Sequence, residues 1–299
     1  MNWSDVGDAM FGGLPVYGEI LALVQNSVWA GAILGLVGGL IGVFVLQRDM
    51  AFAVHGISEL SFAGAAAALL IGADVVTGSI MGSLIAAALI GWLGSRARDR
   101  NSIIGVLMPF GLGLGILFLA LYDGRSANRF SLLTGQIVSV QSAQLTWLIA
   151  IAAVVLVALL LVWRPLRFDS LDPQSAAARG VPTVGISLVF MLLLGLTVAV
   201  AVHIIGALLV MALVVTPAAA AVRVATGPLA VPLLAAGFGV VSAVGGILLA
   251  VAGTLPVSPY ITTVSFLIYL VCRVIGARRG RVLRPDAARR PQATASARG

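Results

Sequence analysis

The residues with the clearest chemical potential are a histidine and a glutamate four positions apart, in the stretch RDMAFAVHGISELSFAGAAAALLIG (48–72). In a helix, this spacing places His55 and Glu59 on one face, with Cβ atoms about 6 Å apart. An imidazole nitrogen and a carboxylate oxygen together suit zinc, manganese or iron(II) better than an alkaline-earth ion. A hydrogen bond between the two side chains, with no ligand, is the alternative that the spacing leaves open.

Motifs for enzymatic catalysis are not supported by the same residues. A zinc protease helix carries two histidines in the order H-E-x-x-H, whereas here the order is H-G-I-S-E and the one other histidine of the chain is His203. The sequence has no Gly-x-Ser-x-Gly elbow and no phosphate-binding loop, and its single cysteine, Cys272, lies in an apolar run. We therefore expect no catalytic residues, and a membrane-embedded hydrolase is disfavoured.

The elements that position these residues are predicted to be membrane-spanning helices. Of the 299 residues, 60% are hydrophobic and 10% charged, whereas soluble domains carry roughly 25% charged residues. Apolar stretches of about 20 residues predict an all-α polytopic bundle of eight or nine spans over residues 24–276. The predicted spans are 24–46, 52–72, 75–95, 103–122, 145–163, 184–202, 204–222, 229–252 and 258–276. The pair within 184–222 can also be counted differently.

The arginines predict the orientation of the bundle. All 18 basic residues are arginine, and the connections on one side hold every one except Arg125 and Arg129. Basic residues gather in cytoplasmic loops, so this side and the C-terminus are predicted to be cytoplasmic. The basic tail 277–299 is predicted to be disordered and near anionic lipid headgroups. Residues 1–23 are predicted to be extracytoplasmic or interfacial. Charges placed in this way do not indicate nucleic-acid binding.

Small residues at four-residue spacing predict close helix packing. Gly31, Gly35 and Gly39 form one such series, and Gly111 and Gly115 form another. Small side chains allow the backbones of neighbouring membrane helices to approach each other. The sequence therefore predicts a tight bundle without a soluble catalytic domain.

A second informative stretch, WRPLRFDSLDPQSAAARGVPTVG (163–185), lies between two predicted spans. Pro165 is predicted to end the preceding span. Asp172 is a suitable N-cap for a helix whose first turn begins with Pro173, and Gly180 is a stop signal. The pattern indicates a surface helix of about two turns at 172–180. Such a helix could dock into a groove of a partner, or it could be an ordinary loop helix.

At these residues the chain resembles the permease subunits of bacterial ATP-binding-cassette importers for zinc, manganese and iron(II). The likeness extends over residues 20–276 and is carried by three stretches in order. They are GLVGGLIGVFVLQRDMAFAVHGISELSFAGAAAALLIG (35–72), FDSLDPQSAAARGVP (168–182) and HIIGALLVMALVVTPAAAAVRVATG (203–227).

The resemblance implies that His55 and Glu59 meet the transported ion. The family places an aspartate first and a histidine second on this turn, whereas here the order is reversed and the acid is a glutamate. Zinc is favoured over manganese and iron(II), because imidazole suits zinc and one carboxylate is oxygen-poor for manganese. His203 is either a further ligand on the outer side or a polar residue at a helix end. No permanently bound cofactor is expected.

The resemblance also implies a fold similar to that of the vitamin B12 and siderophore importer permeases, and a set of partners. These are a cytoplasmic ATP-binding subunit, an extracytoplasmic metal-binding protein, membrane lipid and a second permease copy in a homodimer. The helix at 172–180 is implied to contact the ATPase. Its expected coupling residues are Asp172, Pro173, Ala177, Arg179 and Gly180. The chain itself is expected to be a multi-pass transport subunit of the bacterial plasma membrane, and not an enzyme.

Two other kinds of transporter are the alternatives. A permease for a siderophore or cobalamin complex would need a wide path without ion ligands. A proton-coupled secondary carrier would use His55 and Glu59 as a proton relay and would need no ATPase.

Overall fold

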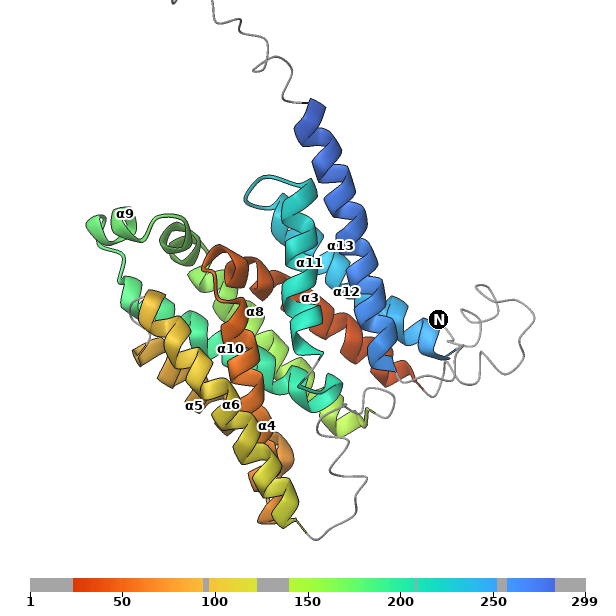
Figure 1. The fold of residues 1–299 in the computed structure, drawn as a ribbon. Helices are drawn as coiled ribbons and strands as arrows, with labels where there is room; N and C mark the ends of the chain where they lie inside the picture. The colour runs from red at the N-terminus through yellow and green to blue at the C-terminus, as the bar shows by residue number, and fades with distance from the viewer. Residues whose placement is uncertain (1–23, 94–96, 123–139, 208, 252–256, 283–299) are drawn as a thin grey trace, which may run out of the picture.

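The computed structural model describes residues 24–93, 97–122, 140–207, 209–251 and 257–282, and all regular structure in these ranges is helical. Eight of the helices are long and apolar enough to cross a membrane, which confirms the predicted all-α membrane bundle (Figure 1). The helices are α3 (Gln25–Gln47), α4 (Ala51–Leu70), α5 (Val75–Leu93), α6 (Ala97–Leu121), α8 (Ser142–Leu171), α9 (Pro173–Ala178), α10 (Thr183–Ile205), α11 (Val210–Val224), α12 (Ala230–Val251) and α13 (Val257–Val282).

The segment predicted to span at 204–222 is the exception. α10 continues to Ile205, and Gly206 follows it with a positive φ of 85°. α11 then has 15 residues, which at 1.5 Å per residue gives about 22 Å, less than the roughly 30 Å of a bilayer core. The described part of the chain therefore contains eight candidate spans and one short apolar helix.

The helices form two groups joined by three central elements. α11, α12 and α13 contact one another, and α4, α5 and α6 form the second group. Figure 1 shows the blue α13 beside α11 and α12, away from the yellow and orange helices α4, α5 and α6. α3 packs mainly against α11 and α12, α10 packs against α4 and α5, and α8 lies against both α3 and α10. The most buried long helices are α3, α4 and α10, so α4 is an interior helix.

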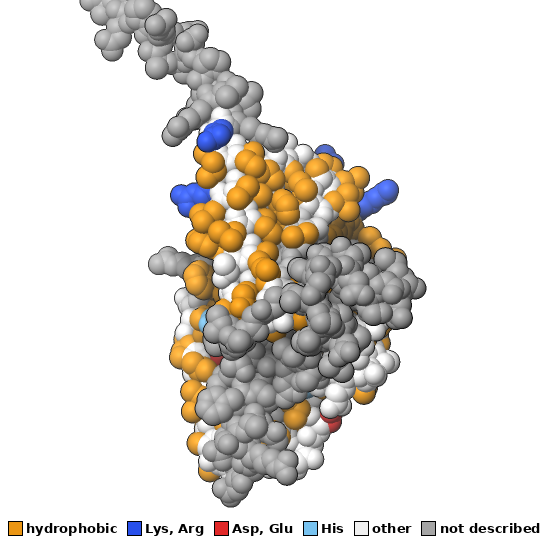
Figure 2. Space-filling view, turned by 90° about the vertical axis from the view of Figure 1, so that its right-hand side faces the viewer, with side chains coloured by type: hydrophobic (Ala, Val, Ile, Leu, Met, Phe, Trp, Pro, Cys, Tyr) orange, Lys and Arg blue, Asp and Glu red, His pale blue; other side chains and the backbone are white. Residues whose placement is uncertain are grey.

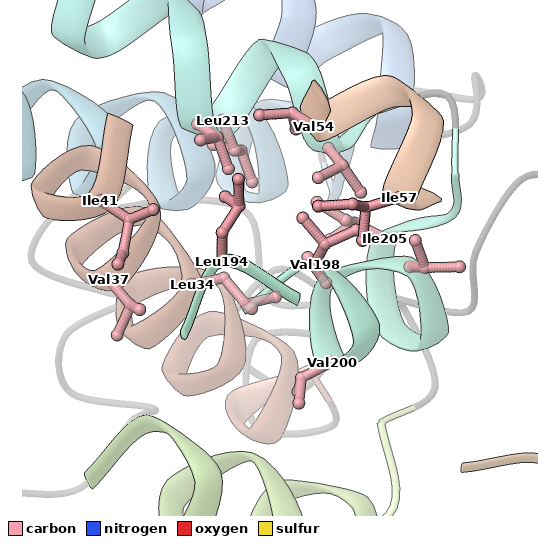
Figure 3. Packing of buried hydrophobic residues seen from close by; sticks show 14 of the residues in the cluster. Leu34, Val37, Ile41, Val54, Ile57, Leu194, Val198, Val200, Ile205 and Leu213 are labelled. Carbon is pink, nitrogen blue, oxygen red and sulfur yellow. The ribbon is translucent and has the colours of Figure 1, made fainter. Parts of the chain in front are cut away.

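The hydrophobic core lies where these central helices meet. Figure 3 shows aliphatic side chains from α3, α4, α10 and α11 converging on one region. Ile41, Val54, Ile57, Leu194 and Leu213 are all at most 1% exposed. Their packing fixes α4 between α10 and α11, and thereby fixes the helix that carries His55 and Glu59.

Both predicted glycine series lie at helix crossings. A Cβ atom on Gly35 would overlap the carbonyl group of Gly239 in α12, so α3 and α12 approach at backbone distance. A Cβ atom on Gly115 would overlap the ring of Phe62 in α4, and Gly111 lies against the same helix. The spacing read from the sequence therefore marks the contacts of α3 with α12 and of α6 with α4.

The outer surface is largely apolar, as expected for helices that face lipid. Figure 2 shows hydrophobic side chains over the visible face and basic side chains at its upper end, around the end of α13. Large exposed side chains include Trp92 and Leu161, which are 77% and 78% exposed. A surface of this kind is stable in a bilayer, where lipid tails cover it.

The prediction that Pro165 ends a span was wrong. α8 continues through this proline to Leu171. Proline removes one backbone hydrogen bond of the helix, but Leu166 and Asp169 beyond it are buried, at 0% and 4% exposure. Tertiary contacts therefore hold the last turn of α8 in place. Pro109 and Pro217 also lie inside helices, α6 and α11.

The described residues also bear on the predicted tail. α13 continues to Val282, so the first part of the range 277–299 is helical. The rest of that range and the N-terminal segment 1–23 lie outside the described residues.

Candidate metal path

His55 and Glu59 lie on adjacent turns of α4, as their spacing predicts. The Nε2 atom of His55 is 3.5 Å from Oε1 of Glu59. The imidazole side chain is 27% exposed and the carboxylate side chain 5% exposed. The pair thus presents a nitrogen and an oxygen donor together, with the carboxylate deeper in the bundle. The structure contains the hydrogen-bonding geometry that both readings of the pair require.

Serine side chains hold α4 in register around this pair. Ser58 donates a hydrogen bond to the carbonyl oxygen of His55 (2.8 Å). Ser61 contacts Ser79 of α5, with 2.8 Å between their hydroxyl oxygens, and Ser79 donates to the carbonyl oxygen of Ala199 in α10 (3.1 Å). Buried hydroxyl groups that bond across helices fix α4 against α5 and α10.

α6 covers one side of the site. A Cβ atom on Gly111 would lie 2.8 Å from the Leu60 side chain and 3.1 Å from the carbonyl carbon of Glu59. Within the described residues, no group of three or more His, Cys, Asp and Glu side chains is placed to hold a metal ion. One described chain therefore offers the ion a two-donor site here.

His203 lies at the opposite end of the bundle. α4 and α10 both begin near Arg48, which precedes α4 and contacts Ser187 near the start of α10. His55 is therefore close to this end, whereas His203 is in the last turn of α10. The sequence placed His203 between two spans, but α10 continues past it. The structure does not bring His203 together with His55 and Glu59.

The surroundings of His203 are polar. Its Nε2 atom is 3.2 Å from Nε2 of Gln144 in α8, and its buried Nδ1 atom has no hydrogen-bond partner among the described residues. Asp74, which precedes α5, interacts electrostatically with His203. Hydrogen bonds from the backbone N–H and the hydroxyl group of Thr77 hold the pKa of the Asp74 carboxyl below its ordinary value. A nitrogen and a carboxylate thus occur at this end as well.

The short helix between two spans is present as α9. Asp172 is its N-cap and accepts a hydrogen bond from the backbone N–H of Ser175 (3.0 Å), and Pro173 is in the first turn. Gly180 has a positive φ of 81°, a backbone conformation that glycine adopts readily. Gln174 and Ala177 are exposed, whereas Ala176 is fully buried. α9 therefore has one face fixed to the bundle and one open to a partner.

An ion pair that the sequence did not predict lies beside α9. Arg48, directly after α3, pairs with Asp169 of α8, and their side chains are 8% and 5% exposed. The sequence identified Arg48 only as a basic loop residue. The two residues are 121 positions apart, so no local pattern links them. A single signal was available in retrospect, namely an aspartate after Pro165 in an otherwise apolar and basic segment.

Comparison with known proteins agrees with this architecture. Residues 21–276 match the ABC 3 transport family. The chain is 34% identical over 226 residues to a manganese transport system membrane protein, MntC, of Halalkalibacterium halodurans, which covers 75% of this chain and 77% of the relative. It is 27% identical over 257 residues to a manganese import system permease protein, ScaB, of Streptococcus parasanguinis, covering 86% and 91% of the two chains.

Two solved structures have a similar fold. PsaBC from Streptococcus pneumoniae in complex with Fab matches with a TM-score of 0.79 and 25% identity, over 94% of this chain and 99% of that chain. A metal-chelate type ABC transporter in an inward-facing conformation matches with a TM-score of 0.64 and 19% identity, over 88% and 86%. The second likeness concerns the fold alone.

The family match spans the helices that carry His55, Glu59, His203 and α9. Members of this family are transport subunits that work with an ATPase and an extracellular metal-binding protein. The described chain is therefore a membrane-embedded protein of the ABC 3 transport family, the metal-type permease subunits of ATP-binding-cassette importers for divalent metals.

Proposed function

We propose that this chain imports a divalent transition metal ion through a path in which His55 and Glu59 contact the ion. The observation that carries the proposal is their contact, 3.5 Å between Nε2 and Oε1, inside a buried spanning helix of a metal-type permease. Ionisable groups inside a membrane helix are costly and mark ion paths by default. A path needs few ligands, because an ion that must leave has to be held weakly.

Two metals are candidates for the cargo, and different observations support them. Relatives named as manganese importers, at 34% and 27% identity, support manganese. The donor pair itself supports zinc, because one imidazole and one carboxylate provide fewer oxygen ligands than manganese prefers. We place manganese first, since the relatives cover most of the chain, and zinc second on the chemistry of His55 and Glu59. Direct competition between the two ions distinguishes them.

The permease is proposed to act as a homodimer. One described chain supplies two donors at the site, and a second copy would bring two more to one central path. Cross-linking of purified complex, followed by mass measurement, tests this. A complex with one permease copy per pair of ATPase subunits would overturn it.

The α9 end of the bundle is proposed to be cytoplasmic and to contact the ATPase. Support comes from the described arginines near this end, among them Arg48, Arg167 and Arg179. The exposed residues of α9 would make the contact, with Asp172, Pro173, Ala177, Arg179 and Gly180 as the coupling residues. Nucleotide binding and hydrolysis would then move α9 and switch the bundle between outward and inward access.

His203 is proposed as a second ligand, at the outer end of the path. The support is its unpartnered buried Nδ1 atom and the nearby Asp74. His203→Ala should then raise the metal concentration for half-maximal uptake and leave the maximal rate unchanged. Gln144→Ala is the matched control, because it removes the hydrogen-bond partner and keeps the imidazole. An unchanged half-maximal concentration in His203→Ala would make His203 a structural residue.

The function is tested by uptake into proteoliposomes that contain this chain, its ATPase and the metal-loaded binding protein. Manganese and zinc are offered separately and then in competition, with and without ATP. We expect ATP-dependent uptake of a free metal ion, and the preferred ion in competition identifies the cargo.

The same vesicles separate the proposal from its rivals. Uptake driven by a proton gradient without the ATPase would indicate a secondary carrier. Uptake of a siderophore or cobalamin complex, with no uptake of free ions, would indicate a chelate permease. Either result would overturn the proposed function.

A further inference from the structure

The Arg48 guanidinium group connects three helices at the α9 end of the bundle. Arg48 directly follows α3 and forms an ion pair with Asp169 in the last turn of α8. Its Nε atom donates to the hydroxyl oxygen of Ser170 (2.9 Å), and its Nη1 atom donates to that of Ser187 in α10 (3.3 Å). The guanidinium carbon is 5.3 Å from the ring centroid of Phe190, also in α10. One side chain is thus fixed by both neighbours of α9.

α9 is built onto the same turn of α8 that holds Arg48. Asp172 ends α8 and at the same time caps α9. Arg179, which ends α9, lies over the ring of Phe168 with its guanidinium carbon 5.4 Å from the centroid. Ala176 in the middle of α9 is fully buried. A displacement of α9 therefore moves Phe168 and the adjacent Asp169.

On its other side, Arg48 is joined to the helix of the proposed metal path. Only two residues separate Arg48 from the first residue of α4. The connection is tight, because Met50 donates to the carbonyl oxygen of Val45 (2.8 Å) and Ala53 to that of Met50 (3.0 Å). His55 follows in the second turn of α4. A shift of Arg48 is thus transmitted to the turn that carries the imidazole.

We infer that the Arg48–Asp169 pair transmits movement of α9 to α4, so that Arg48 and Asp169 are positioning residues for transport. Stability alone is a weak reason for such a pair, because a buried ion pair is often no more stabilising than apolar residues of similar volume. A planar guanidinium held by a carboxylate and two hydroxyl groups fixes distance and direction together. That is the property needed to pass a displacement from one helix to another.

The test uses the complete complex with the ATPase and the binding protein, because the inference rests on the proposed function. The variants are Arg48→Gln, Asp169→Asn, the double variant and the conservative Arg48→Lys. Arg167→Gln is the matched control: it removes a charge from the same end of α8, and Arg167 lies outside the ion pair. The readouts are the amount of ATPase subunit bound, ATP hydrolysis, metal uptake and nucleotide-dependent amide hydrogen exchange in α9 and α4.

We expect Arg48→Gln and Asp169→Asn to bind and hydrolyse ATP normally while metal uptake per ATP falls about tenfold, within the range typical of coupling between sites. The double variant should lose no more than either single one, and Arg48→Lys should recover part of the uptake, since it keeps the charge. Nucleotide should still change hydrogen exchange in α9 of the variants, but no longer in α4.

Two results would overturn the inference. One is a loss of uptake in proportion to the loss of assembled complex, which would show a purely structural pair. The other is an unchanged response of α4 to nucleotide in Arg48→Gln. Hydrogen exchange is read without metal, so it decides the link even where the wild-type complex imports none. Absence of ATP-dependent uptake by the wild type would contradict the proposed function alone.

Discussion

Gly111 of α6 lies directly against the backbone of Leu60 in α4. A Cβ atom at position 111 would be 3.0 Å from the Leu60 nitrogen, closer than side-chain carbons normally approach. α6 can therefore cover the Glu59 side of α4 only while position 111 has no side chain. This crossing positions the carboxylate of the proposed path.

Gly111→Val should separate α6 from α4, because the added atoms have no space. Overpacking of a well-packed contact costs about 1–3 kcal/mol, so the melting temperature of the purified permease should fall. Gly113→Val is the matched control on the same helix, since no atom lies within 4 Å of a Cβ there. Equal melting temperatures for the two variants would show that the α4–α6 contact is not tight.

Glu59→Gln should reduce metal uptake, because it removes the anionic donor and keeps the size of the side chain. Losing an interaction with a charged group of about 1.5–3 kcal/mol corresponds to roughly tenfold or more. His55→Ala should have a similar effect. Ser58→Ala is the control, since Ser58 lies between them and bonds only to the backbone of its own helix. Normal uptake by both variants would reduce the pair to an intrahelical hydrogen bond.

Exchange of the pair to an aspartate at position 55 and a histidine at position 59 addresses the choice of metal. His55→Asp combined with Glu59→His restores the order that the family resemblance implies. If the donor order sets the preference, the ratio of manganese to zinc uptake should change from that of the wild type. The ratio is measured by competition in the same vesicles. An unchanged ratio would show that other groups choose the ion.

The orientation of the bundle can be read from chemical labelling. With Cys272 replaced by serine, we expect Ala73→Cys to react with an impermeant maleimide added outside intact cells. Gln174→Cys in α9 should react only after the membrane is permeabilised. Both positions are exposed in the structure, so the side of the membrane decides the reaction. Labelling of position 174 in intact cells would reverse the topology.

The N-cap of α9 predicts a dependence on pH. The hydroxyl and backbone N–H groups of Ser175 donate hydrogen bonds to Asp172 and hold the pKa of its carboxyl below the ordinary value. Because the folded-state pKa is lowered, this stabilisation is complete at neutral pH and is lost as the pH falls below about 4. Amide exchange in α9 should accelerate several-fold in Asp172→Ala at neutral pH, and Asp172→Asn should retain most of the protection. Equal exchange in all three proteins would contradict the capping role.

Much of this protein was determined by its sequence, because the relevant interactions are local. A run of about 20 apolar residues must form a helix in lipid, where backbone groups have no water to bond. The spacing of His55 and Glu59 fixes their common face, and Asp172, Pro173 and Gly180 define α9 through contacts of a few residues.

Only the tertiary structure decided the rest, because it depends on groups far apart in the chain. Pro165 was expected to end a span, but the burial of Leu166 and Asp169 holds α8 in place beyond it. The Arg48–Asp169 pair joins residues 121 positions apart, and no periodicity indicates such a contact. His203 was placed at the end of α10, away from His55, by the point at which Gly206 stops the helix. Local chemistry is encoded by neighbours in sequence, whereas long-range contacts exist only once the helices have packed.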